Sequence, residues 1–146
     1  MSKILALSEA VGIALHSMGL LAIENKALNA NVITERTGSS KHHIAKILQR
    51  LVKAGLLTST RGPSGGFTLA KPPKEINLLC IYEAIEGKVH IHACPMDSKY
   101  CPFDHNCMLD DVGEKIAKDF LEYMQNTSLE DIKNSRKNNL QSNKLT

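Results

Sequence analysis

Cys94, Cys101 and Cys107 lie in one polar stretch of this 146-residue chain, separated by six and then five residues. Cysteine thiolates are ligands for zinc and for iron–sulfur clusters. Zinc fingers and ferredoxins use cysteine pairs about two to four residues apart, which this stretch lacks. The wider, uneven spacing, with Pro95 and Pro102 in irregular sequence, is typical of a loop that wraps one metal cluster.

Three thiolates leave one coordination position for another ligand. The candidate donors carry oxygen or nitrogen, and they are Glu9 of the partner subunit, His90, His92, Asp104, His105 and Asp110. Incomplete thiolate ligation makes a cluster easier to lose or modify, which suits a sensor better than an electron carrier. Cys80 stands apart from these cysteines in the sequence, and we expect it to be a small buried apolar residue.

Charge divides the chain into two unlike halves. Residues 1–74 carry ten Lys or Arg against three Asp or Glu, a net charge of +7, whereas residues 75–146 carry eight against twelve, a net −4. This asymmetry indicates a nucleic-acid-facing surface on the first half. The apolar N-terminal stretch is interrupted by Glu9 and His16, which argues against a membrane span or a signal peptide. We therefore expect a cytoplasmic protein, whose thiols stay reduced.

The first half has the pattern of a helix-turn-helix. Apolar residues at helical spacing predict one long helix over residues 3–24. A short helix is expected over 31–37, stopped by Gly38, and Ser39 and Ser40 offer N-cap oxygens to a second helix over 41–54. Two helices joined by a tight glycine-containing turn form a helix-turn-helix.

A β-hairpin is expected to follow. Residues 56–61 and 67–70 read as two strands, and the loop Gly62–Gly66 (GPSGG) supplies the turn residues that a hairpin needs. A helix-turn-helix followed by a two-stranded hairpin is a winged helix. The fold class is therefore mainly α with a small β-hairpin.

The second half is expected to be helical around the cysteine loop. Asn77 can cap a short helix over 78–86, and apolar residues every four positions after Cys107 predict a helix of about five turns. Thr127 and Ser128, ahead of Glu130 and Asp131, can make a capping box for a last short helix. The tail from residue 135 is rich in Asn, Lys and Ser, and we expect it to be disordered.

The winged helix predicts how DNA would be bound. The second helix fits the major groove, with its N-terminal residues near the bases and its other basic residues near phosphates. An arginine of the wing can enter a narrow minor groove, and wing glycines allow close approach to the backbone. The expected DNA-binding residues are Ser40, Lys41, His42, His43, Lys46, Arg50, Arg61, Gly62, Ser64 and Gly65. One winged helix contacts few base pairs, so a dimer on a pseudo-palindromic operator is expected.

Four segments together resemble a known family. Residues 51–57 (LVKAGLL), 61–67 (RGPSGGF), 69–73 (LAKPP) and 81–87 (IYEAIEG) look like the Rrf-type family of bacterial winged-helix transcription regulators. The three loop cysteines place the chain near the iron–sulfur members of that family, which include regulators of cluster status and a nitric-oxide sensor. The resemblance covers roughly residues 1–125.

The resemblance implies a homodimer, held by the long helix after Cys107, with the N-terminal helix packing across. It implies a 2Fe–2S or 4Fe–4S cluster on the three cysteines, whose state changes the affinity for DNA. The implied fourth ligand is Glu9 of the partner subunit, with Asp110 as second choice. The family commonly has Tyr-Leu-Glu where this chain has His43-Ile44-Ala45, so an operator sequence cannot be carried over.

These expectations divide the chain into three parts. Residues 1–75 form the winged helix-turn-helix domain, 76–134 the connector helix, cysteine loop and long dimerisation helix, and 135–146 the tail. The predicted function is a transcription regulator that senses nitric oxide, redox state or iron–sulfur status. One alternative is the same type of regulator using its cysteines for zinc or as bare thiols.

An alternative from another class is an iron–sulfur electron carrier or assembly protein. The wing and the basic half argue against it, since an electron carrier has no need of a groove-binding helix. The sequence shows no phosphate loop, paired carboxylates or Ser-His-Asp arrangement, and we expect no enzymatic activity.

Overall fold

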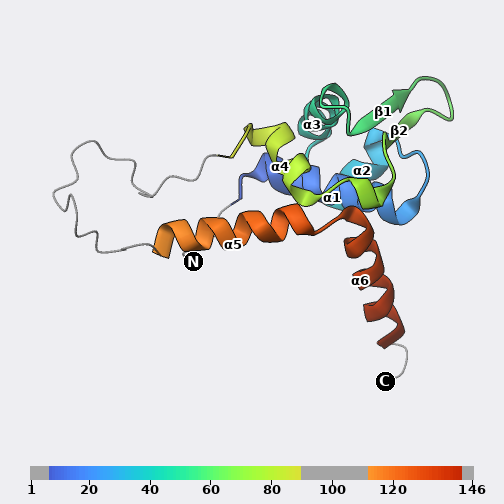
Figure 1. The fold of residues 1–146 in the computed structure, drawn as a ribbon. Helices are drawn as coiled ribbons and strands as arrows, with labels where there is room; N and C mark the ends of the chain where they lie inside the picture. Colours follow the sequence, from blue (N-terminus) through green and yellow to red (C-terminus); the bar gives the residue numbers. More distant parts are fainter. Residues whose placement is uncertain (1–6, 90–111, 143–146) are drawn as a thin grey trace.

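The computed structural model describes residues 7–89 and 112–142 (Figure 1). Its elements, in chain order, are α1 (Glu9–Glu24), α2 (Ala30–Thr37), α3 (Lys41–Lys53), β1 (Leu57–Thr60), β2 (Gly66–Leu69), the short 3-10 helix η1 (Pro73–Glu75), α4 (Leu78–Glu86), α5 (Val112–Asn126) and α6 (Leu129–Ser142). This is the expected fold class, mostly helical with one two-stranded antiparallel sheet. None of these described helices is long and apolar enough to cross a membrane.

The core forms where α3 packs against α1, α2 and α4. The apolar positions of α3 are buried at helical spacing, at Ile44, Ile47, Leu48 and Leu51. Each such side chain contributes about 1.5–3 kcal/mol when it is removed from water. The exposed side of α3 therefore remains free to carry basic residues.

Side-chain caps set where the helices begin. The Ser8 hydroxyl accepts a hydrogen bond from the Val11 N–H, so α1 begins at Glu9, whereas the sequence predicted a start near Lys3. The backbone at Ser8 is extended, so α1 cannot continue through Ser8 towards the N-terminus. Residues 1–6 lie outside the described part of the chain. The predicted caps Ser40 and Asn77 are confirmed, since they accept hydrogen bonds from the N–H groups of His43 and Cys80.

The wing is tied to the helical body along its outer edge. Leu57 pairs with Leu69 and Thr60 with Gly66 in the hairpin, while Leu28 and Phe67 exchange two backbone hydrogen bonds of 3.1 and 2.8 Å. A Cβ atom on Gly66 would lie 2.6 Å from the Leu28 carbonyl oxygen. Gly66 is thus required for this close approach of two backbones, which fixes the wing against the segment before α2.

The turn between α5 and α6 docks on the start of α4. The Leu78 N–H donates to the Thr127 carbonyl and the Leu129 N–H to the Ile76 carbonyl. The predicted capping box is present: the Ser128 hydroxyl accepts from the Asp131 N–H, and the Asp131 carboxylate accepts from the Ser128 N–H. The hydroxyl and N–H of Ser128 lower the pKa of the Asp131 carboxyl. The ionised carboxylate therefore stabilises this turn until the pH falls through its pKa in the folded state.

Helix α6 differs from its sequence-based expectation. It continues to Ser142, whereas the composition predicted a disordered tail from Ser135. The capping box supplies the costly first turn, and the Lys, Arg, Gln and Leu residues that follow are adequate helix formers. In Figure 1, α5 runs beneath the winged helix and α6 turns sharply away from it.

Candidate nucleic-acid interface

Helix α3 is the second helix of the helix-turn-helix and is called the recognition helix, and the β1–β2 hairpin is called the wing. The two lie along one side of the molecule (Figure 1). The side chains of Lys41, His42 and Lys46 on α3 are exposed, as a groove-binding helix requires. Ser40 is exposed but its hydroxyl accepts the His43 N–H at 3.3 Å. Ser40 therefore sets the start of the helix that presents the basic residues.

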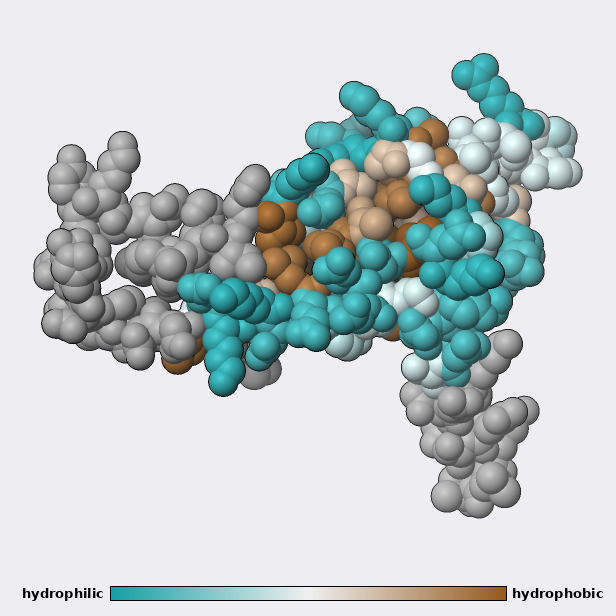
Figure 2. Space-filling model, viewed as in Figure 1, coloured by the Kyte–Doolittle hydropathy of each residue, from teal (hydrophilic) through white to brown (hydrophobic). Residues whose placement is uncertain are grey.

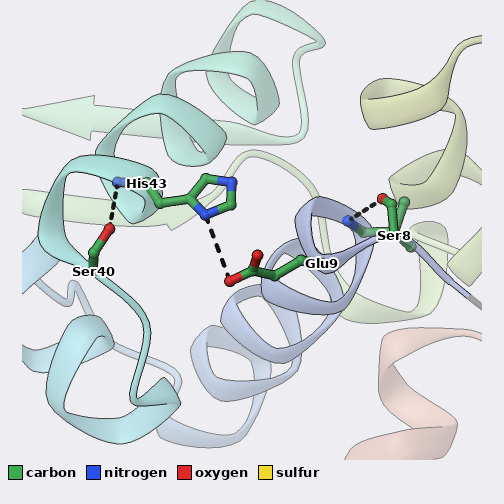
Figure 3. Close-up of polar contacts among 5 residues, drawn as sticks. Ser8, Glu9, Ser40 and His43 are labelled. Carbon is green, nitrogen blue, oxygen red and sulfur yellow. Dashed lines mark hydrogen bonds and ion pairs between the residues drawn. The ribbon is translucent and has the colours of Figure 1, made fainter.

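His43 is half-buried and its ring is directed at another helix. Its Nδ1 lies 3.8 Å from the Glu9 carboxylate, at the first turn of α1 (Figure 3). The contact is an ion pair when the imidazole is protonated. Sequence reasoning missed this contact, because the two residues are far apart in the chain and no local motif around either one predicts that they meet.

Arg50, expected at a phosphate, is exposed on α3 and also contacts α4. Its guanidinium donates a hydrogen bond to the Ile85 carbonyl, in the last turn of α4. Ile85 itself is buried against the core. Arg50 thus joins the recognition helix to the helix that precedes the cysteine segment.

The tip of the wing has the expected turn chemistry. Arg61, Gly62 and Ser64 are exposed and Gly65 is half-buried. Gly62 has a φ of 110°, a conformation that favours glycine, and its carbonyl accepts the Gly65 N–H at 2.9 Å. The wing thereby holds Arg61 at an exposed corner of the hairpin loop.

Most of the expected metal ligands lie outside the described residues. These are Cys94, Cys101, Cys107 and Asp110, together with the other donors His90, His92, Asp104 and His105. Within the part of the chain that the structure describes, no group of three or more His, Cys, Asp or Glu side chains could hold a metal ion.

Glu9 is the one expected ligand that the described residues include. Its side chain is 77% exposed at the start of α1, where a carboxylate is open to a second subunit. Its neighbour Ser8 donates a hydrogen bond to the Glu86 carboxylate of α4. The oxygen donor set and the exposure of Glu9 are thus compatible with the role of a partner's ligand.

Cys80 was expected to be buried and this prediction is wrong. The thiol is free and exposed on α4. Leu78, Ile81 and Ile85 form the core-facing side of this helix, and the helical period turns position 80 away from them.

The chain matches the sequence model of the Rrf2 family, described as iron-dependent transcriptional regulators, over residues 7–135. A candidate HTH-type transcriptional regulator of Neisseria meningitidis serogroup A is 30% identical over 112 residues, which is 77% of this chain and 75% of that protein. A protein of the same description from a serogroup B strain matches to the same extent.

Two solved structures share the fold. CymR, the global cysteine regulator of B. subtilis, has a TM-score of 0.74 at 24% identity and covers 90% of this chain and 98% of its own. IscR from T. potens has a TM-score of 0.71 at 25% identity, covering 91% of this chain and 89% of its own.

Proposed function

Because this chain belongs to the Rrf2 family of transcriptional regulators, we propose that it is a homodimer whose affinity for operator DNA is set by an iron–sulfur cluster. The DNA is a double-stranded, pseudo-palindromic operator read by two recognition helices. The single observation that carries the DNA-binding part is the exposed basic side of α3 beside an arginine-tipped wing. A regulator that binds chromosomal DNA works in the cytoplasm, which is therefore its proposed location.

The proposed base contacts come from the first turn of α3, at Lys41, His42 and His43. Lys46 serves a phosphate, and Arg61 enters the minor groove. Gly62, Ser64 and Gly65 bring the wing backbone to the sugar-phosphate chain. Ser40 acts as the N-cap that orients these groups.

Helix α5 supports the homodimer. Three large apolar side chains of α5 are exposed in the single chain: Val112 (49%), Ile116 (48%) and Tyr123 (58%). Removing such side chains from water is favourable, so an exposed group of them indicates a contact with another protein surface. Figure 2 also shows apolar surface over α1 and α4, above the hydrophilic side chains of α5. A second copy of α5 and α1 would cover these side chains, as a symmetric dimer requires. We accordingly assign residues 1–75 to DNA binding and 76–134 to the cysteine loop and the dimer contact.

The cluster would be held by Cys94, Cys101 and Cys107, with Glu9 of the partner subunit as fourth ligand and Asp110 as second choice. When bound, a 2Fe–2S or 4Fe–4S centre supplies a group that reacts with oxidants and nitric oxide. Likeness to IscR and the iron-dependent family description support this assignment. The cysteine segment follows α4 in the chain and Glu9 begins α1, and both of these helices contact the recognition helix.

A second candidate is a thiol-sensing regulator without a cluster. Its support is the likeness to CymR, a cysteine regulator, including a structure of an oxidised form from Staphylococcus aureus. In that case the three cysteines, or the exposed Cys80, would respond as bare thiols or bind zinc.

The deciding experiment is a visible spectrum with iron and sulfide assays on protein purified without oxygen. Absorption near about 400–450 nm with matching iron and sulfide supports the cluster. A colourless protein that cannot be reconstituted would favour the thiol or zinc regulator. DNA binding by gel shift, with and without the cluster, then gives the direction of control.

A further inference from the structure

The last turn of α4 is held by two other helices. Arg50 of α3 donates to the Ile85 carbonyl, and Ser8 at the start of α1 donates to the Glu86 carboxylate. Residue 90, where the cysteine-bearing segment begins, comes four positions after Glu86. The recognition helix is therefore hydrogen-bonded to the last turn of α4, which precedes that segment in the chain.

The Arg50 contact has a clear electrostatic reason. The last carbonyls of a helix have no partner within the helix, and they carry the negative end of the helix dipole. The Ile85 carbonyl is one of them, and the cationic guanidinium of Arg50 satisfies it. The buried side chain of Ile85 keeps this carbonyl in place, so the hydrogen bond joins two fixed pieces of backbone.

The chain after α4 is folded back on the same turn. The Gly87 N–H donates to the Glu83 carbonyl at 2.9 Å, and the Val89 N–H donates to the Glu83 carboxylate at 3.3 Å. A shift of Gly87 or Val89 would therefore act on the turn of α4 that contains Ile85. The Ile85 carbonyl in that turn is the group that accepts the hydrogen bond from Arg50.

Arg50 is also poorly placed to read bases. It lies about 14 Å along the helix axis from Lys41, at 1.5 Å per residue, whereas base contacts come from the N-terminal turn. The hydrogen bond to Ile85 directs one guanidinium nitrogen of the exposed Arg50 towards α4.

We propose that Arg50 is a positioning residue that transmits the state of the cysteine segment to the recognition helix, rather than a phosphate ligand. The inference deepens the proposed function and rests on it for the identity of the signal. By linkage the transmission works in both directions: DNA on α3 must change the stability of the last turn of α4.

This reciprocity allows a test on metal-free protein. The DNA is a duplex enriched from a random-sequence pool by the metal-free wild type. Arg50→Met keeps an unbranched apolar stem of similar helix propensity and removes the guanidinium donor. Lys46→Met is the matched control on the same helix. The measurements are the salt dependence of the Kd and hydrogen exchange of the Gly87 and Val89 amides with and without DNA.

In wild type, DNA should slow exchange of these two amides. Arg50→Met should lose that slowing and weaken DNA binding by about 2- to 30-fold, the range of coupling effects, with an unchanged salt slope. Lys46→Met should keep the slowing and lower the salt slope by about 1, as a lost phosphate contact does. Arg50→Lys retains a cationic donor and should retain the slowing.

Two results would overturn the proposal. One is a salt slope for Arg50→Met that falls by about 1, which would make Arg50 a phosphate ligand. The other is a DNA-dependent slowing that persists in Arg50→Met, or is missing in wild type. Neither depends on a cluster, so a failed cluster assay would remove the proposed signal and leave this result intact.

Discussion

The Glu9 carboxylate lies 3.8 Å from Nδ1 of His43, so the first turn of α1 meets the first turn of the recognition helix (Figure 3). Glu9 is also the proposed ligand for the partner subunit's cluster. A carboxylate that binds the cluster of the partner shares its negative charge with the metal, and less of that charge then acts on His43. Within the proposed function, cluster binding would therefore weaken the Glu9–His43 ion pair beside the proposed base-contacting residues.

Replacing Glu9 by Gln should strengthen DNA binding by metal-free protein. The change keeps the shape of the side chain but removes a negative charge from the DNA-facing end of α3. We expect a gain of about 1.5- to 5-fold, the size of an exposed ion pair, measured by fluorescence anisotropy. The same variant should hold less iron after reconstitution.

Glu24→Gln is the matched control for Glu9→Gln, because Glu24 lies at the other end of α1 and pairs with Lys26. It should change neither DNA affinity nor iron content. Equal gains in affinity for both variants would show a general charge effect and remove the Glu9–His43 contact from the explanation.

Arg61→Ala should weaken DNA binding about fivefold or more while cluster content stays as in wild type. A specific arginine contact with DNA is worth about 1–3 kcal/mol, and Arg61 is exposed at the corner of the wing. Paired measurements of Kd and iron per protomer test this. Unchanged affinity would exclude Arg61 from the interface.

Gly66→Ala should lower the free energy of unfolding by about 1–3 kcal/mol and impair DNA binding. A Cβ there meets the Leu28 carbonyl oxygen at 2.6 Å, so the wing has to move off the body. Urea denaturation gives the stability change.

Gly12→Ala provides the comparison for Gly66→Ala. Gly12 lies inside α1, and nothing lies within 4 Å of the position that a Cβ atom would take there. The substitution should raise stability by about 0.5–1 kcal/mol through helix propensity. A similar loss of stability in both variants would contradict the role given to the Leu28–Gly66 approach.

Ile116→Glu should dissociate the proposed homodimer. Ile116 is 48% exposed on α5, and a charge there would be buried by a second copy. Gln125→Glu adds the same charge nine positions further along, on the opposite side of the helix, and should leave the dimer intact. Sedimentation velocity separates the two outcomes, and a dimer that survives Ile116→Glu would move the contact away from this side of α5.

Cys101→Ala should abolish the cluster while the chain still folds and dimerises. Its thiolate is one of three ligands in the proposed centre, whereas the described residues by themselves bury a cluster of apolar side chains between Val11 and Leu129. Iron analysis and circular dichroism test the two halves of this prediction. An unfolded variant would make the metal centre structural.

The sequence by itself determined the local elements of this protein. Glycine and proline positions predicted the wing, Ser40 and Asn77 predicted helix starts that the structure confirms, and the apolar period of residues 41–54 identified the core side of α3. These features depend on neighbours within a few residues, whose spacing can be read directly. The family resemblance was also correct, because it rests on several such local motifs together.

Only the tertiary structure decided which helices touch through polar groups. Glu9 meets His43 and Arg50 meets the Ile85 carbonyl because packing of the core sets the angles between α1, α3 and α4. No periodicity in the chain encodes such contacts between residues over thirty positions apart, and a lone charged residue gives the same signal whether it faces DNA or a carbonyl. The sequence therefore identified the recognition helix, while the fold decided which polar groups of α1 and α4 contact it.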